Sequence, residues 1–158
     1  MTSHREVAEN WIKQTGKATK GFNVWYFYET IYSYGTHFPI ARIRNKKGRD
    51  VVFSTNRRAS ISTAKHISHV RSAIRGKEVY TVDDITSEDS ATVSANLKDY
   101  KARIRALLAS AERRRLELYR EFDIDNAHKL DMERIAYARL YGRTVKPLFV
   151  GNGIELSA

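Results

Sequence analysis

Residues 22–34, Phe-Asn-Val-Trp-Tyr-Phe-Tyr-Glu-Thr-Ile-Tyr-Ser-Tyr, are aromatic or β-branched at most positions. Side chains of these kinds favour β-strands, because they pack well on a pleated surface. We expect Glu29-Thr30 to form a turn that divides this run into the two strands of a tight hairpin, with Gly35 following it. The stretch therefore predicts the start of an antiparallel sheet.

Two further strands are predicted directly after this hairpin. Residues 37–44 form the first, and Pro39 places it at a sheet edge or near the start of its strand, because proline cannot donate a backbone hydrogen bond. Residues 45–48, Asn-Lys-Lys-Gly, indicate a basic turn, and residues 50–55 form the next strand. Together these segments predict a meander of three or four antiparallel strands.

One helix is predicted before the meander in the sequence and another after it. Ser3 and Glu6 have the spacing of a capping box, so we expect a helix over about 4–15 that packs through Trp11 and ends at Gly16. A second helix is expected to begin at Ser60 or Ser62 and to end at about residue 74, before Gly76. Residues 77–90 are acidic, with a short strand expected at 79–82.

The C-terminal part of the chain predicts a pair of long helices. Apolar residues at four- and three-residue steps mark the first helix, over about 90–122: Val93, Leu97, Tyr100, Ile104, Leu107, Ala111, Leu118 and Phe122. Residues 123–126, Asp-Ile-Asp-Asn, are expected to break the pattern, and a second helix over about 127–141 should end at Gly142. A short loop between long helices favours an antiparallel hairpin. The tail, residues 146–158, is expected to be extended or loose.

These elements predict an α+β fold: a small antiparallel meander with packed helices, and a C-terminal antiparallel helical hairpin. We divide the chain into a basic α+β module (1–76), an acidic connector (77–89), the helical hairpin (90–145) and a tail (146–158).

Positive charge is concentrated in one part of the chain. The net charge of the 158 residues is +10, and residues 20–76 contain eleven Lys or Arg but only two acids, Glu29 and Asp50. The excess of nine in that segment is almost the whole excess of the protein. A cationic field of this kind attracts phosphates. The alternative is that the charge serves solubility alone.

The expected phosphate contacts lie in this basic segment. They are Arg42, Arg44, Lys46, Lys47, Arg57, Arg58, Ser62, Thr63, Lys65 and Arg71. A helix beginning near Ser62 would add free amides and the positive end of its dipole. Trp25, Tyr32 and Tyr34 are candidates for stacking on bases, although aromatic strands are more often part of a core.

Residues 33–39, Ser-Tyr-Gly-Thr-His-Phe-Pro, form a dense polar motif, and residues 62–66, Ser-Thr-Ala-Lys-His, follow downstream. Together with Phe53-Ser54-Thr55 and Val70-Arg71, these strings resemble a family of uncharacterised bacteriophage proteins with a Ser-Tyr-Gly-x-His-Phe-Pro core motif. The resemblance covers residues 22–75. It implies a phage origin and a unit made of a meander and a helix, but it implies no mechanism.

Two further hypotheses compete with binding alone: cleavage of a phosphoester by histidines, and a metal site. His37 and His66 could act as general base and acid in metal-independent phosphoester cleavage, with Lys65 stabilising the transition state. Against this, the sequence has no familiar catalytic spacing, so we expect no catalytic residues. His66 and His69 are spaced for one helical face, but no nearby acid completes a metal site, so we expect neither a metal nor a cofactor.

We therefore expect a protein that binds nucleic acid or nucleotide phosphates without catalysis. Two alternatives stay open: a phage inhibitor that binds a host protein or defence complex, and a metal-independent nuclease or phosphodiesterase. The long apolar stripe of the hairpin could also form a homo-oligomer. The sequence contains no cysteine, no apolar N-terminal run and no membrane-spanning stretch, so we expect a cytoplasmic protein without a membrane partner, in the host cell if it is phage-encoded.

Overall fold

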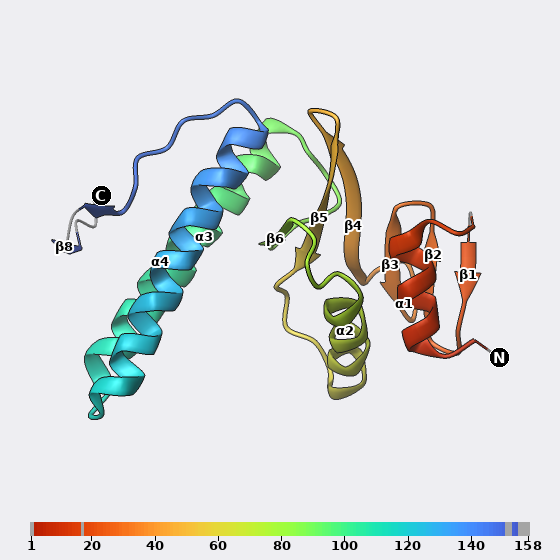
Figure 1. The fold of residues 1–158 in the computed structure, drawn as a ribbon, viewed down its shortest axis with the longest axis horizontal. Coiled ribbons are helices and arrows are strands. Elements are labelled where there is room, and N and C mark those ends of the chain that lie inside the picture. Colours follow the sequence, from red (N-terminus) through yellow and green to blue (C-terminus); the bar gives the residue numbers. More distant parts are fainter. Residues whose placement is uncertain (1, 17, 151–152, 155–158) are drawn as a thin grey trace. The chain divides into compact units, whose positions relative to one another are not determined.

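A computed structural model describes residues 2–16, 18–150 and 153–154 (Figure 1). The chain divides into two compact units, Met1–Ser87 and Glu88–Ala158. The first contains a mixed sheet and two helices, and the second contains two long helices and a small β-hairpin. The predicted α+β class is confirmed.

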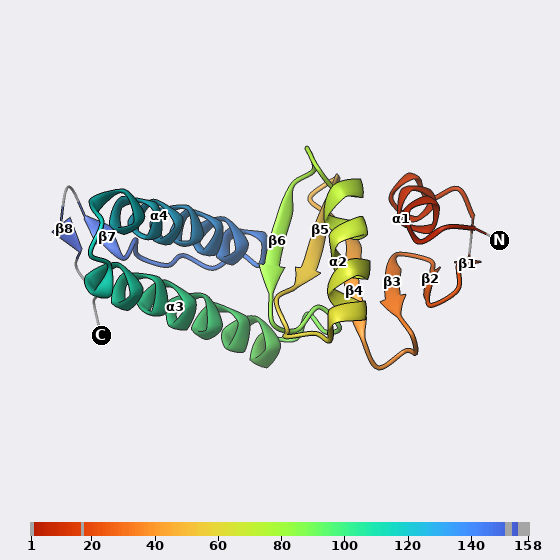
Figure 2. The ribbon, with the colours of Figure 1, turned by 90° about the horizontal axis from the view of Figure 1, so that it is seen from below.

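The sheet of the first unit has six strands in the order of the sequence (Figure 2). They are β1 (Ala18–Lys20), β2 (Val24–Phe27), β3 (Thr30–Ser33), β4 (Pro39–Lys46), β5 (Arg49–Thr55) and β6 (Val79–Val82). The first five form the predicted antiparallel meander, with one strand, β1, that the sequence did not reveal. The chain then crosses over through α2 (Ile61–Ala73), so β6 pairs with β5 in parallel.

Two turns of the meander differ from the prediction by one or two residues. Thr30 already pairs with Phe27, so the β2–β3 turn is Tyr28-Glu29, and Tyr28 takes a φ of 49°. The β4–β5 turn is Lys47-Gly48, with φ of 53° and 81°, because Asn45 and Lys46 extend β4. Two-residue turns with positive φ match the twist of the strands they join, which fixes both hairpins in register.

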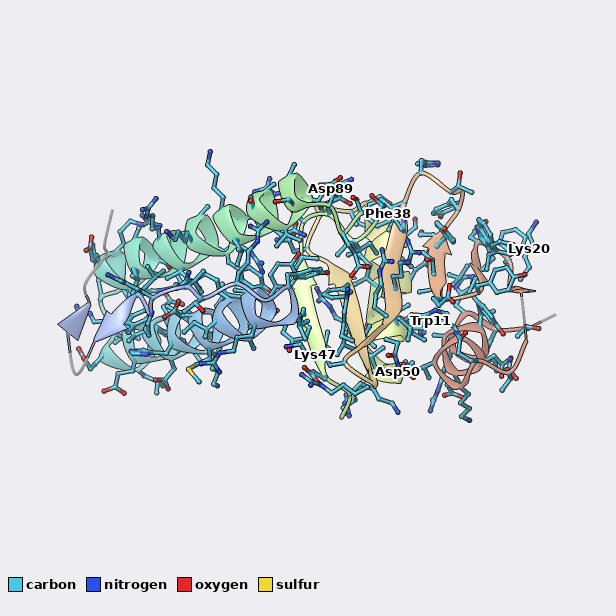
Figure 3. All side chains as sticks on the ribbon, turned by 90° about the horizontal axis from the view of Figure 1, so that it is seen from above. Trp11, Lys20, Phe38, Lys47, Asp50 and Asp89 are labelled. Carbon is cyan, nitrogen blue, oxygen red and sulfur yellow. The ribbon has the colours of Figure 1, made fainter. Side chains whose placement is uncertain are left out.

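Both helices of this unit pack on one face of the sheet. The predicted capping box of Ser3 and Glu6 begins α1 (His4–Lys13), which ends at Gln14 rather than at Gly16. Trp11 is fully buried, and its Nε1 donates to the Glu29 carbonyl at the β2–β3 turn (Figure 3). Helices α1 and α2 share a core with the strands that contains Val7, Ala8, Trp11, Val24, Tyr26, Ile31, Ile40, Ala41, Ile43, Val52, Ile67, Val70 and Ile74. Burial of this apolar surface is the main source of stability for the unit.

The second unit is the predicted helical hairpin, but the turn is in another place. Helix α3 spans Ser90–Arg113 and α4 spans Glu117–Leu140, so residues 123–126 lie inside α4. The prediction of a break there was wrong because Asp123 is buried and accepts hydrogen bonds from Ser110 and Arg114. A buried carboxylate whose hydrogen bonds are satisfied in this way holds α4 against α3.

The turn position changes the exposure of several side chains. Arg114 and Leu116 lie in the turn, and Leu118 and Phe122 are exposed on the first turns of α4 instead of continuing the buried stripe of α3. The buried stripe of α3 ends at Leu108 and Ala111.

The segment after α4 runs back along the hairpin. Residues 143–148, which we call the strap, precede strands β7 (Phe149–Val150) and β8 (Gly153–Ile154). Arg134 and Asp131, both almost fully buried, form an ion pair of 2.8 Å beneath the strap. Arg134 Nη2 donates to the Lys146 carbonyl and Asp131 Oδ2 accepts from the Leu148 amide, so this part of the tail is anchored rather than loose. None of the described helices is long and apolar enough to cross a bilayer.

Candidate nucleic-acid interface

A run of exposed cations lies on α2, in the loop before it and in the turn after it. Residues 51–77 contain six Lys or Arg and no Asp or Glu. All six are exposed: Arg57, Arg58, Lys65, Arg71, Arg75 and Lys77. Arg58, Lys65, Arg71 and Arg75 make no ion pair within the described residues. We call these four residues the α2 basic surface.

The geometry of α2 spreads this charge along a line. Lys65, Ser68 and Ser72 follow one side of the helix at three- and four-residue steps, and Arg75 lies two residues beyond Ala73, the last residue of the helix. With a rise of 1.5 Å per residue, the helix from Lys65 to Ala73 is about 12 Å long. One strand of a nucleic-acid duplex presents about four phosphates over that length.

The start of α2 is capped by Ser60, one of the two caps expected. Its hydroxyl accepts from the Thr63 amide and donates to the Thr63 hydroxyl. Ser62 is exposed beside the first turn, as phosphate binding requires, whereas Thr63 is buried and also accepts from Ser33. Ser62 is therefore placed to meet a ligand, and Thr63 faces the sheet.

The predicted basic residues of β4 do not belong to the α2 basic surface. Arg42 and Arg44 alternate with Ile43, whose side chain is in the core under the helices, so they leave the sheet on its other face. Arg42 donates to the Thr86 carbonyl at 3.4 Å, and Arg44, Lys46 and Lys47 each interact with other groups of the chain. Lys47 lies with Asp50 at the β4–β5 turn (Figure 3).

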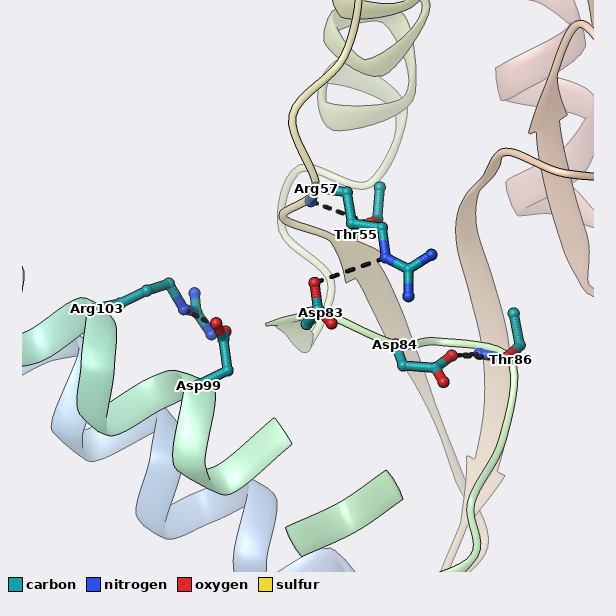
Figure 4. Close-up of polar contacts among 7 residues, drawn as sticks. All are labelled: Thr55, Arg57, Asp83, Asp84, Thr86, Asp99 and Arg103. Carbon is teal, nitrogen blue, oxygen red and sulfur yellow. Dashed lines mark hydrogen bonds and ion pairs between the residues drawn. The ribbon is translucent and has the colours of Figure 1, made fainter. Parts of the chain in front are cut away.

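Two arginines of the basic segment are already paired with carboxylates. Arg49 makes a bidentate contact with Glu78, which lowers the pKa of that carboxyl group mainly through the hydrogen bond. Arg57 lies 3.6 Å from Asp83 (Figure 4). Both pairs are solvent-exposed and contribute little to stability, but each carboxylate reduces the local positive potential. Arg57 is therefore a weaker candidate for a phosphate contact than Arg58.

The two predicted catalytic histidines occupy different surroundings. His66 is buried on the inner side of α2, with Nδ1 2.7 Å from the Ser33 hydroxyl and its ring edge-to-face with His4 at 4.5 Å. Burial, and then the nearby His4 and His69, lower the pKa of His66. His37 is exposed and lines a small pit with Arg57 and Asp83. In the part of the chain that the structure describes, no recorded hydrogen bond or ring contact joins His37 to His66.

The Ser-Tyr-Gly-x-His-Phe-Pro motif and the start of α2 meet through this buried contact. Ser33 donates to Thr63 and contacts His66, so residues about thirty positions apart hold the helix against the sheet. Lys65, one residue before His66, points to solvent. Among the described residues, no group of three or more His, Cys, Asp or Glu is arranged to hold a metal ion.

The aromatic candidates form a cross-strand pair. Trp25 and Tyr32 are opposite each other on β2 and β3, and their rings stack at 4.5 Å. They alternate with the buried Tyr26 and Ile31, so they face away from α1. Trp25 Nε1 donates to the Tyr34 carbonyl, while the half-exposed Tyr34 ring contacts His66.

The expected phosphate contacts did not include Arg75 and Lys77, although both are exposed in the same acid-free run. The signal that could have found them is the absence of any acid between Val51 and Lys77, which is more specific than a count of bases.

Compared with protein families, curated proteins and solved structures, the chain matches none of them.

Proposed function

We propose that this protein binds nucleic acid through the phosphate backbone, using the α2 basic surface, and that it does so without catalysis. The observation that carries the proposal is the run of exposed cations in residues 51–77 with no acid among them. Phosphates contacted by such a run release condensed counterions, which drives sequence-independent binding.

The number of contacts sets the salt dependence. Four phosphate contacts, one for each residue of the α2 basic surface, give a slope of about −3.6 for log K against log salt concentration on duplex DNA. Affinity should therefore fall about 150-fold between about 50 and about 200 mM salt. Ser62 and the free amides at the start of α2 add contacts that do not change this slope.

Fluorescence anisotropy with labelled duplex DNA and single-stranded RNA tests the proposal. Arg71→Glu/Arg75→Glu should weaken binding at least about tenfold and reduce the slope to about −1.8, because two of the four contacts are lost. The matched control is Arg105→Glu/Lys129→Glu, which reverses two exposed charges on α3 and α4 and changes net charge equally. If both variants lose the same affinity, the net charge explains binding and the assigned surface is wrong.

The histidine positions support binding rather than cleavage. A base and an acid must reach the same substrate, but His66 is buried against Ser33, and no contact among the described residues joins it to the exposed His37. We expect no cleavage of DNA or RNA during long incubation. Cleavage that His37→Ala/His66→Ala abolishes would contradict this part of the proposal.

A second function is favoured by the end of the hairpin. Leu116, Leu118, Tyr119 and Phe122 are 52–73% exposed within seven residues, a concentration of apolar surface that often marks a protein contact. We propose that this end binds a protein partner, either a host protein or a second copy. Light scattering separates the two, because only a second copy gives a concentration-dependent mass that Leu118→Ser/Phe122→Ser abolishes.

The Ser-Tyr-Gly-x-His-Phe-Pro motif of residues 33–39 is the basis for a proposed place of action. We propose that the protein acts in the cytoplasm of a bacterial host, where nucleic acid and host protein complexes are both accessible.

A further inference from the structure

The strap and α3 form the walls of a cleft in the second unit. Its volume is about 470 Å³, within the usual range of small-molecule sites. The strap is fixed over α4 by Arg134 and Asp131, whose buried ion pair binds the Lys146 carbonyl and the Leu148 amide. The cleft is therefore a built feature of the fold, because buried charges hold one of its walls.

The wall made by α3 has a regular pattern. Ser94, Leu97, Lys98 and Lys101 line the cleft at steps of three, one and three residues, which places them on one helical face. Arg143 of the strap is fixed opposite them, since its guanidinium donates to the Ser94 hydroxyl at 2.8 Å and to the carbonyl and hydroxyl of Ser90.

The cleft carries one sign of charge. Lys98, Lys101 and Lys146 line it, and none of the three forms an ion pair among the described residues. No carboxylate in the described part of the chain lines the cleft, and both Asp131 oxygens are bound by Arg134 and the Leu148 amide. Like charges that converge without a counterion repel one another, and an anion relieves that repulsion.

The cleft also has an apolar part. Leu97, Val145 and Leu148 line it between the cations, and its exposed lining is mostly apolar. Inorganic phosphate alone would leave this surface in water. A ligand with an apolar body and a negative group would cover it, and burying apolar surface adds affinity.

We propose that this cleft binds a small organic anion: an aromatic or aliphatic body that carries a phosphate or carboxylate group. The negative group is bound by Lys98, Lys101 and Lys146, and the body lies on Leu97 and Val145. This site is separate from the α2 basic surface and needs no nucleic acid.

The probe for the test is 1-naphthyl phosphate, with 1-naphthol and inorganic phosphate as its two halves. Titration of the full chain, followed by backbone amide shifts in NMR, should show saturable binding with the largest shifts at Leu97, Lys98 and Val145. Affinity should exceed that of either half at least about tenfold, because both the charge and the apolar body contribute.

Variants locate the site. Lys98→Ala/Lys101→Ala should weaken binding about tenfold, as expected for two solvent-exposed charged hydrogen bonds. Arg105→Ala/Lys129→Ala removes two exposed bases from the same helices outside the cleft and should leave affinity unchanged. Arg71→Glu/Arg75→Glu should also leave it unchanged, which keeps this result independent of nucleic-acid binding.

Three results would overturn the proposal. The first is the absence of saturable binding to the unmodified protein. The second is equal weakening by the Lys98/Lys101 and Arg105/Lys129 variants, and the third is a set of shifts that maps to α2.

Discussion

Replacement of Asp131 by alanine should destabilise the second unit severely. The change leaves the Arg134 guanidinium, 1% exposed, without its carboxylate and leaves the Leu148 amide without its acceptor. Removal of one partner from a buried ion pair costs about 3–5 kcal/mol, because the remaining charge is uncompensated. A folded unit of this size has a total free energy of unfolding of only about 4–10 kcal/mol.

Urea unfolding followed by far-UV circular dichroism measures this loss, because the long helices dominate that signal. With an m-value of about 1 kcal/mol/M, the midpoint of the hairpin should fall by about 3 M or more. Trp11 and Trp25 are the only tryptophans and lie in the first unit, so their fluorescence follows that unit separately.

Two further variants define the cause. Asp131→Asn keeps an acceptor for the Leu148 amide but loses the charge, so it should lie between Asp131→Ala and the unmodified protein. Asp125→Ala removes an exposed carboxylate from the same helix and should change the free energy of unfolding by less than about 0.5 kcal/mol. A loss below about 1 kcal/mol for Asp131→Ala would refute the view that the buried pair holds the strap.

Three more predictions concern the first unit, all measured by urea unfolding with tryptophan fluorescence. The lowered pKa of His66 means that the unfolded chain binds more protons than the folded one, so the free energy of unfolding should decrease as pH falls below about 6.5. His66→Gln should remove much of this pH dependence. Equal stability at about pH 7.5 and about pH 5.5 would contradict the prediction. Ser60→Ala should cost about 1 kcal/mol through the lost cap of α2, and a neutral result would show that the cap is dispensable. Ser33→Ala should cost about 1–3 kcal/mol, because it leaves the buried Nδ1 of His66 without its hydrogen-bond partner, whereas the exposed Ser68→Ala should cost almost nothing. Equal effects would argue against the buried contact.

Most of the sheet was predictable because its strands carry local signals. Alternation and β-branching mark β2 to β5, and the turn residues at Lys47-Gly48 have a clear chemistry. Strand β1 has only three residues, Ala18–Lys20, and is defined by its pairing with β2. The parallel pairing of β6 with β5 depends on a crossover through α2, which no local pattern shows.

The position of the hairpin turn shows why local signals fail in the C-terminal half. Asp123 and Asn126 have the composition of a turn, and Leu118 and Phe122 that of a buried stripe. In the fold, Asp123 is bound by Ser110 of α3 and by Arg114 in the turn, so a tertiary contact overrides propensity. The positive charge of the candidate site could be predicted from the local sequence, as the strands could. The ion pair of Arg57 with Asp83 could not, because it joins residues far apart in the sequence.

The contacts of Ser33 from the polar motif and the exposed basic side chains lie on opposite sides of α2. On the inner side of α2, His66 and Thr63 contact Ser33, which is fully buried and cannot meet a ligand. On the outer side, Lys65 and Arg71 face solvent. The contact of Ser33 with α2 therefore decides which face of the helix is exposed. Ser33 has no chemical role of its own, because the packed helix covers its hydroxyl group, so the cationic outer face remains the better candidate for function.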